Sequence, residues 1–427
     1  MLSITDIYTL YLTHSVICTD TRNITENCIF FCLKGENFNG NTFAHQALEN
    51  GASFVIVDEK EYVLNNKCIY VKNSLDTLQK LAQCHRAHLN IPIIGITGSN
   101  GKTTTKELIN TILSSQYNVF ATYGNLNNHI GVPLSLLSIN KDVEIAIIEM
   151  GANHPHEIAF LCSLALPTMG LITNIGKAHL EGFHTINTII ETKTALYKSV
   201  KQRNGQLFVN NDDSLLLNYA YGSLLITYGK NNKADYKGEL LSDELFCKVL
   251  LPTTNTIIST QLIGNYNFYN IMAAIAVGRY FNISLQNIQT SLATYKPTNS
   301  RSQILYIGTN TIILDAYNAN PSSMEVALYN FASLKSKNKI IILGDMKELG
   351  IASEEEHQQI VNLINKLDFS EVFLVGPEFK KTHNQGMQIF ESYEEASTFI
   401  SLKKPQDSMI LIKGSRTMKM ERFLEII

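Results

Sequence analysis

Apolar residues in this chain gather into short runs that alternate with polar and helical segments. Three β-rich runs joined by Asn/Gly turns occupy its beginning: IFFCLKG, ASFVIVDE and CIYVKN (29–35, 52–59 and 68–73). A helical stretch over 75–88 follows and leads to the dipeptide Ile91-Pro92. Because proline disfavours helix in the residue before it, we predict a domain boundary here and a first domain over residues 1–90.

The middle of the chain repeats a strand, turn and helix order. An apolar run over 93–96 enters a glycine turn, and the helix expected over 103–115 carries an apolar stripe at helical spacing. Two further continuous apolar runs, 144–150 and 170–176, read as buried strands. Such strands alternating with helices are typical of a mostly parallel sheet covered on both faces. We therefore predict a central domain over residues 91–297.

The remaining residues, 298–427, show the same alternation separately. Four apolar runs each end in glycine or a polar residue: TIILD, KIIILGD, EVFLVG and SMILIKGS (311–315, 339–345, 371–376 and 408–415). Polar residues at strand ends favour an open α/β sheet with a site in its crevice. The chain lacks a GxGxxG motif, so a dinucleotide-binding fold is not indicated. The predicted fold class is α/β in three domains.

Composition narrows the class of protein. With 45% hydrophobic residues, 17% charged residues and a net charge of −3, the chain reads as a soluble globular protein without a field that would attract nucleic acid or a membrane. Seven cysteines without a CxxC pair predict reduced thiols. The N-terminus lacks a signal-peptide pattern, and no apolar run reaches the roughly 18 residues of a membrane span. We expect a cytoplasmic protein.

The strongest local signal is GITGSNGKTTTKE, residues 95–107. A strand that enters a helix through a glycine turn directs backbone N–H groups and the helix dipole at an anion. Gly98 and Gly101 allow the bend, Lys102 supplies positive charge to phosphates, and the Thr103 hydroxyl suits magnesium. The spacing departs from GxxxxGK[ST] because residue 96 is Ile. ATP binding is the favoured interpretation, and a structural strand–helix turn is the alternative.

Magnesium bound with a nucleotide needs oxygen ligands, so carboxylates should accompany the loop. Glu149 ends the strand predicted over 144–150, and His179 follows the strand predicted over 170–176. Taken alone, Glu149 is equally well interpreted as a solvated carboxylate at a strand end, and a lone histidine such as His179 is more often structural than a ligand. Since parallel strands end at one sheet edge, we expect both side chains near the Lys102 loop and propose them for the metal.

Several motifs together resemble the Mur ligase family over essentially the whole chain, and within it the branch that adds D-alanyl-D-alanine. They are TDTR, GENFNGNTFAHQALENGA, GSNGKTTTKE, GNLNNHIGVPLSLL, EMGANHP, NYNFYNIMAAIAVG, DAYNANPSSM, LGDMKELG and KGSRTMKME. The resemblance implies a small α/β N-terminal domain that binds a UDP-muropeptide, a central P-loop ATPase domain and a Rossmann-like C-terminal domain.

The resemblance also implies an activity. The terminal carboxylate of a UDP-MurNAc-tripeptide would attack the γ-phosphate of ATP, and the amine of D-Ala-D-Ala would then displace phosphate from the acyl phosphate. Such catalysis is mainly positioning and charge neutralisation. The implied cofactors are ATP and Mg²⁺. The implied partners are the two small-molecule substrates, UDP-MurNAc-tripeptide and D-Ala-D-Ala. We expect a monomer that neither binds nucleic acid nor inserts into a membrane.

Site residues carried over from the resemblance fall into four groups. The nucleotide phosphates would lie on Gly98, Ser99, Asn100, Gly101, Lys102, Thr103 and Thr104. Asn270 would lie near the adenine, Arg301 at the γ-phosphate and Asp315 at the ribose. Metal would bind Thr103, Glu149 and His179. Substrate would contact Thr21, Arg22, Asn125, Asn127, Asn128, His129, Asn318 and Asn320. For Arg22 and Arg301, a solvated surface arginine is the plain alternative.

Three positions are less regular. Lys193 matches a lysine that Mur ligases carry carbamylated, although its surroundings read TKTA where the family usually has AKGE-like residues, and an ordinary solvated lysine is the alternative. Carbamylation needs a neutral amine and hence a lowered pKa. Tyr266 stands where the family's HNxxN motif usually has histidine. The acidic run EEEH (354–357) is interpreted as a solvated helix start.

Other functions remain open from the sequence. A sister ligase or a folylpolyglutamate-type synthase would add a diamino acid or glutamate instead. A catalytically silent relative would bind nucleotide or muropeptide as a sensor, although Lys102, Thr103, Glu149, His179 and Arg301 are all present. A plain P-loop kinase or switch would leave the TDTR and KGSRTMKME segments unexplained.

Overall fold

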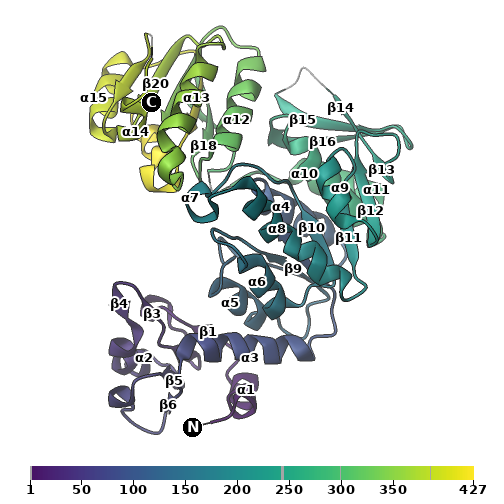
Figure 1. The fold of residues 1–427 in the computed structure, drawn as a ribbon, viewed down its shortest axis with the longest axis vertical. Helices are drawn as coiled ribbons and strands as arrows, with labels where there is room; N and C mark the ends of the chain where they lie inside the picture. Colours follow the sequence, from purple (N-terminus) through teal and green to yellow (C-terminus); the bar gives the residue numbers. More distant parts are fainter. Residues whose placement is uncertain (1, 242–244, 299, 385) are drawn as a thin grey trace.

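The structure is a computed structural model that describes residues 2–241, 245–298, 300–384 and 386–427. Figure 1 shows three α/β domains that follow one another along the chain, from the purple N-terminal domain through the teal central domain to the green and yellow C-terminal domain. The predicted α/β class with three domains is therefore confirmed. Among the described residues, we find no helix with both the length and the apolar character to cross a bilayer.

The N-terminal domain is built on a four-stranded parallel sheet with short strands. Its order is β1 (Ile17–Cys18), β2 (Ile29–Phe31), β5 (Phe54–Val57) and β6 (Cys68–Tyr70). Helices α1 (Ile4–Thr13), α2 (Ala44–Glu49) and α3 (Ser74–His88) and the hairpin β3 (Lys34–Gly35)–β4 (Phe38–Asn39) complete it. On α3, the buried Arg86 donates to the Ala165 carbonyl at 2.8 Å, which fastens this domain to the central one.

The central domain carries the large parallel sheet that the apolar runs predict. Its order is β13 (Tyr236–Lys237), β12 (Leu224–Gly229), β11 (Gln206–Asn210), β10 (Met169–Ile172), β7 (Ile93–Thr97), β9 (Ile145–Glu149) and β8 (Val119–Ala121). Its helices are α4 (Lys102–Leu113), α5 (Gly131–Leu137), α6 (Glu157–Ala165), α7 (Leu180–Phe183), α8 (Ile186–Lys201), α9 (Ser214–Ala220), α10 (Asn267–Tyr280) and α11 (Leu285–Thr294). Strand β7 lies between β10 and β9, so its carboxyl end opens at the middle of the sheet edge.

An antiparallel sheet beside this domain is a finding that the apolar runs do not predict. It consists of β14 (Glu239–Leu241), β15 (Phe246–Leu251) and β16 (Thr256–Ile263). Strand β15 alternates half-buried and buried residues, since one face packs on the core formed with α10. This sheet leads directly into the segment that precedes α10.

The C-terminal domain has a six-stranded sheet with one antiparallel edge strand. Its order is β17 (Gln303–Ile307), β18 (Asn310–Asp315), β22 (Met409–Lys413), β19 (Lys339–Gly344), β20 (Glu371–Val375) and β21 (Gln388–Phe390), and only β17 runs antiparallel. Its helices are α12 (Pro321–Ser333), α13 (Ser353–Ile364), α14 (Pro377–Lys380) and α15 (Tyr393–Lys403). The carboxyl ends of β18 and β22 face the central domain.

The interpretation of residues 354–357 is only half right. A helix does begin at Ser353, and its first turn is acidic. However, Glu356 and His357 are buried instead of solvated. Glu356 accepts from Lys177 of the central domain at 2.7 Å, and the His357 Nε2 atom accepts from the Met346 backbone at 3.0 Å. The helical period places these two residues on the buried face of the helix. A run of four polar residues does not by itself indicate this burial.

Candidate functional site

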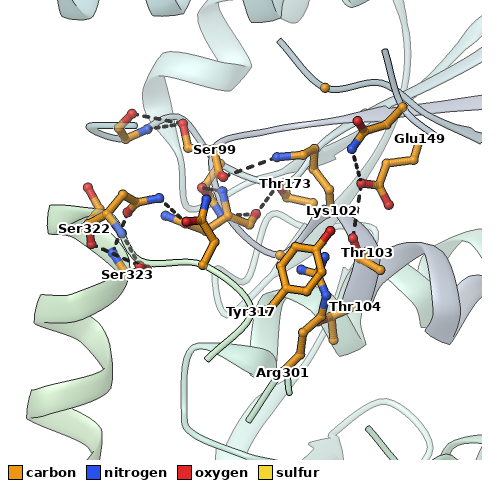
Figure 2. Close-up of a pocket in the computed structure, with 18 of the residues that line it drawn as sticks. Ser99, Lys102, Thr103, Thr104, Glu149, Thr173, Arg301, Tyr317, Ser322 and Ser323 are labelled. Atoms are coloured by element: carbon orange, nitrogen blue, oxygen red, sulfur yellow. Dashed lines mark hydrogen bonds between the residues drawn. The ribbon is translucent and has the colours of Figure 1, made fainter. Parts of the chain in front are cut away.

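A cavity of about 780 Å³ lies between the central and C-terminal domains (Figure 2). We call its lining residues between 99 and 270 the central wall and those between 301 and 413 the C-terminal wall. The structure brings most of the predicted site residues into this one lining: Ser99, Asn100, Gly101, Lys102, Thr103, Thr104, Asn125, Asn127, Asn128, His129, Glu149, His179, Asn270, Arg301, Asp315, Asn318 and Asn320.

The turn between β7 and α4 depends on two glycines with left-handed backbone angles. Gly98 has φ +147°, and a Cβ there would lie 1.9 Å from the Thr173 hydroxyl. Gly101 has φ +80°, and its Cβ would lie 2.7 Å from the Asn270 side-chain oxygen. Both strain and contact therefore exclude larger residues at these positions. The prediction that these glycines shape the loop is consistent with this geometry.

The loop is fixed from the neighbouring strand end, by residues that the sequence interpretation did not single out. Asn174, just after β10, accepts from the Ser99 backbone at 2.9 Å and from the Asn100 backbone at 3.0 Å. Thr173 donates to the Asn100 carbonyl at 2.6 Å, and the Ser99 hydroxyl donates to Gly176 at 3.0 Å. The polar end of the run GLITNIG was the available signal for this support.

The beginning of α4 is suited to an anion. Gly101 provides no side-chain cap, and the first intrahelical bond runs from Thr105 to Gly101. The backbone N–H groups of residues 102–104 therefore lack helical acceptors and face the cavity with the positive end of the helix dipole. The Lys102 ammonium donates to the Gly98 carbonyl at 2.6 Å. Burial lowers the pKa of Lys102, opposed by the charge of Glu149 and aided by that of Arg301.

Glu149 has the environment expected of a metal-binding carboxylate. Its Oε1 atom accepts from Thr103 at 3.2 Å and from Asn127 at 2.9 Å, as Figure 2 shows. Its Oε2 atom is buried without a hydrogen bond, and the nearest charge is Lys106, at 3.9 Å. An orphaned buried carboxylate oxygen beside a threonine hydroxyl fits a magnesium ion that keeps several waters. Among the described residues, no cluster of three or more His, Cys, Asp or Glu side chains offers a metal site.

His179 lines the same cavity but faces the C-terminal domain. Its Nδ1 atom contacts the Glu348 carboxylate, and this contact holds the pKa of Glu348 below its usual value. The Glu181 backbone also donates to the Glu348 carbonyl at 3.1 Å. The turn is tight, since His179 has φ +52°. His179 thus lies at the meeting point of the two domains and shares the cavity lining with the Lys102 loop.

Arg301 and Asp315 form the centre of the C-terminal wall. The Arg301 guanidinium stacks on Tyr317, with its Cζ atom 3.6 Å from the ring centroid, and its buried Nε atom has no hydrogen bond. Asp315 ends β18 and accepts from Lys413 at 2.6 Å. The prediction missed Tyr317 and Lys413. Lys413 could not be found from the sequence, because only the sheet register places the end of β22 beside that of β18.

Asn270 closes the lining above α4. It accepts from Thr105 at 3.1 Å and donates to Asn267 at 2.8 Å, and both asparagines are buried. Tyr266, where histidine was expected from the resemblance, also lines the cavity and forms a 2.5 Å hydrogen bond with Ser302. The pair of asparagines therefore ties α10 to α4, whereas Tyr266 reaches the C-terminal domain.

The asparagine-rich segments divide between structural and cavity roles. Asn128 accepts from the backbone of Gly131, the first residue of α5, at 2.8 Å, while Asn127 donates to Glu149. Asn320 caps α12 and donates to Asn100 at 2.9 Å, across the domain boundary. Asn318 is an exposed part of the lining.

Lys193 lies behind the cavity and is absent from its lining. It is 1% exposed on α8, with its ammonium 5.9 Å from the Phe183 ring centroid. Burial lowers its pKa well below the usual value, and Lys102 adds to the effect. The alternative of a solvated lysine is therefore wrong, because α8 turns this position into the core.

Thr21 and Arg22 do not join the cavity. They lie on the N-terminal domain, where Arg22 pairs with Asp20 at 2.6 Å and its side chain is 86% exposed. This contact lowers the pKa of Asp20 to about 2. Figure 1 shows the N-terminal domain at the bottom, the C-terminal domain at the top and the central domain between them, so a UDP-linked ligand reaching both Arg22 and the cavity would have to extend along the central domain.

Three family models match the chain in order. The first is described as Mur ligase family, catalytic domain (residues 13–92), the second as Mur ligase middle domain (residues 96–278) and the third as Mur ligase, glutamate ligase domain (residues 300–416). Together these matches run through all three domains of the structure.

Individual relatives agree over nearly the full length. A UDP-N-acetylmuramoyl-tripeptide--D-alanyl-D-alanine ligase of Bacillus subtilis is 35% identical, covering 96% of this chain and 92% of the relative. The enzyme of that name from Escherichia coli is 31% identical, covering 97% and 94%. The crystal structure of MurF ligase from Thermotoga maritima in complex with ADP is similar with a TM-score of 0.86 and 29% identity, covering 97% of each chain.

Proposed function

The chain belongs to the Mur ligase family, and from this we propose that it joins D-alanyl-D-alanine to a UDP-MurNAc-tripeptide with conversion of ATP to ADP and phosphate. The observation that carries the proposal is the cavity, in which Lys102 and the beginning of α4 face Arg301 and Asp315 of another domain. An amine cannot displace a carboxylate oxygen directly, so the tripeptide carboxylate first takes the γ-phosphate. The amine of D-Ala-D-Ala then expels phosphate from that acyl phosphate.

Each wall supplies part of this chemistry. The free backbone N–H groups of residues 102–104 bind the β- and γ-phosphates, and Lys102 neutralises their charge. Arg301 reaches the γ-phosphate from the opposite wall, Asp315 accepts the ribose hydroxyls, and Asn270 lies near the adenine. Enclosure between two domains excludes water, which would otherwise hydrolyse the acyl phosphate.

Magnesium is part of the proposal. Thr103 and Glu149 would hold it, with His179 at a second position, and Lys193 would support the site as a carbamate formed by its neutral amine. Bound there, the metal would neutralise phosphate charge. The orphaned Glu149 oxygen and the lowered pKa of Lys193 support these assignments.

The remaining assignments concern substrate and setting. We propose that Thr21 and Arg22 bind the UDP-sugar and that Asn125, Asn127, Asn128, His129, Asn318 and Asn320 line the path of the peptide. We further propose domain boundaries near residues 90 and 297, a monomeric state and a cytoplasmic location.

The test is phosphate release from ATP and magnesium with UDP-MurNAc-tripeptide, with and without D-Ala-D-Ala, followed by mass spectrometry of the product. We expect release that depends on the dipeptide and a product heavier by one dipeptide less water. Release that requires a diamino acid or glutamate instead would make the chain a sister ligase. No release with any acceptor, while ADP still binds, would make it a nucleotide-binding relative without turnover.

A further inference from the structure

The segment that enters the C-terminal domain adopts an unusual backbone. Ser300 and Ser302 have φ +55° and +50°, and they flank Arg301. Left-handed angles at residues other than glycine cost free energy and persist only when surrounding contacts impose them. The Tyr317 backbone donates to the Ser300 carbonyl at 3.1 Å, which holds one end of this turn. The other end is held from a different domain.

Tyr266 of the central domain supplies that second contact. Its hydroxyl lies 2.5 Å from the Ser302 hydroxyl, which in turn donates to the Asp315 Oδ1 atom at 3.3 Å. Since the single Ser302 hydroxyl hydrogen points at the carboxylate, the phenol donates to Ser302. Burial and the charge of Asp315 raise the pKa of Tyr266, so the phenol keeps its proton.

The Tyr266 ring is itself held in place. Gly264 has φ +96°, and a Cβ at this position would lie 2.3 Å from the ring. Only glycine therefore lets the backbone before α10 pass this close to the phenol. The Tyr266 hydroxyl is therefore fixed where the central domain meets the turn at residues 300–302.

Asp315 is fully oriented by this network. Its Oδ1 atom accepts from the Ser302 backbone at 3.1 Å and from the Ser302 hydroxyl, and its Oδ2 atom accepts from Lys413 at 2.6 Å. A carboxylate has about four acceptor sites, so capacity remains on the side that lines the cavity. The two hydroxyl groups of a ribose could donate to these remaining acceptor sites of Asp315.

We propose that Tyr266 is a positioning residue for the nucleotide ribose, acting from the central domain through Ser302 on Asp315. The inference rests on the proposed function in one respect, the assignment of Asp315 to the ribose. It assigns a role to the phenol oxygen alone, so removing that oxygen while keeping the ring is the decisive change.

The experiment is calorimetric binding of ADP and of 2′,3′-dideoxy-ADP to the full-length protein. Tyr266→Phe and Ser302→Ala should each weaken ADP about fivefold, the loss of one neutral hydrogen bond, and the double variant should be no weaker than the worse single variant. For the dideoxy nucleotide, Tyr266→Phe should bind like the parent. Tyr117→Phe is the matched control, since its phenol donates at 3.0 Å to Phe281 within the central domain.

The binding results distinguish a role of Tyr266 at the ribose from a merely structural role. Unchanged ADP binding by Tyr266→Phe, or an equal loss for both nucleotides, would overturn the inference, as would the same loss in Tyr117→Phe. Melting temperatures identify a variant that merely unfolds, in which case Ser302→Ala carries the test. In turnover, Tyr266→Phe should raise the KM for ATP about fivefold and change kcat less than about twofold. A parent protein that binds ADP but does not ligate would defeat the proposed function and leave this binding comparison intact.

Discussion

The central wall of the cavity is held by contacts within one domain, whereas the C-terminal wall reaches the cavity through a linker and through contacts that cross a domain boundary. Lys102 and Thr103 follow directly from the β7–α4 turn, which Thr173 and Asn174 fix. Arg301 instead depends on the left-handed turn at residues 300–302, and Asp315 depends on Ser302 and its bond to Tyr266. The phosphate site can therefore be complete before the C-terminal domain docks, while the reacting γ-phosphate is enclosed only afterwards.

Further polar contacts across the boundary agree with this division. Asn320 donates to Asn100 and Lys177 donates to Glu356, so the C-terminal domain touches the phosphate loop and the segment after β10 directly. Because several of these contacts are partly exposed, each is expected to contribute little alone. We therefore expect the free energy of docking to be a sum of small contributions from several contacts. In the central wall, by contrast, one residue, Lys102, should have the largest effect.

The strongest way to break the central wall is Lys102→Met. We expect kcat to fall about a thousandfold, because one positive charge on the transferring phosphate is lost from a site that excludes water. The melting temperature should not fall, since the charged form of this half-buried lysine is already disfavoured. Steady-state phosphate release measures kcat, and thermal unfolding measures the melting temperature. A loss of less than about tenfold would remove Lys102 from the chemistry.

Arg301→Ala tests the opposite wall. We expect kcat to fall about a hundredfold while the affinity for ADP changes little, because the arginine should meet the γ-phosphate that ADP lacks. Turnover and calorimetric ADP binding on the same preparation give the two numbers. Loss of ADP affinity by a similar factor would place Arg301 on the nucleotide in general and would weaken the contrast between the walls.

Lys193→Met tests whether burying this lysine lowers the stability of the central domain. Because the pKa of Lys193 in the fold lies below its unfolded value of 10.5, folding disfavours the ammonium, and this penalty disappears as pH rises through the folded pKa towards 10.5. The variant should be about 1–3 kcal/mol more stable than the parent near neutral pH. The advantage should shrink by about pH 9.5.

Urea unfolding in buffer free of carbon dioxide measures this difference, because carbamylation would change the charge. Lys198→Met, on the exposed face of the same helix, is the control and should show no such trend. An advantage for Lys193→Met that stays constant across the pH range would contradict the assignment of a lowered pKa.

The smallest effect is expected from Glu356→Gln, which removes the charge that meets Lys177. Since Lys177 is half-exposed, we expect kcat to fall only about two- to threefold. Glu355→Gln changes the neighbouring exposed carboxylate, which accepts from Gln359 of its own helix, and should leave kcat unchanged. Equal effects of the two substitutions would mean that this contact has no part in docking.

The sequence predicts the central wall better than the C-terminal wall. The apolar strands, the glycine turn and Glu149 at a strand end were predictable, because period and strand ends are local properties. The support of Asp315 by Lys413 was not, because it depends on the register between the distant strands β18 and β22. The stacking of Arg301 on Tyr317 was not either, because it depends on the left-handed turn at residues 300–302. The burial of Glu356 and His357 was missed since their partners lie in other segments.

The most direct test of the account is a crystal structure with a non-hydrolysable ATP analogue and magnesium. We expect the γ-phosphate within hydrogen-bond distance of both the Lys102 ammonium and the Arg301 guanidinium, with the ribose hydroxyls on Asp315. A nucleotide bound to the central wall alone in the closed arrangement, with Arg301 still stacked on Tyr317 and turned from the phosphates, would contradict the two-wall site.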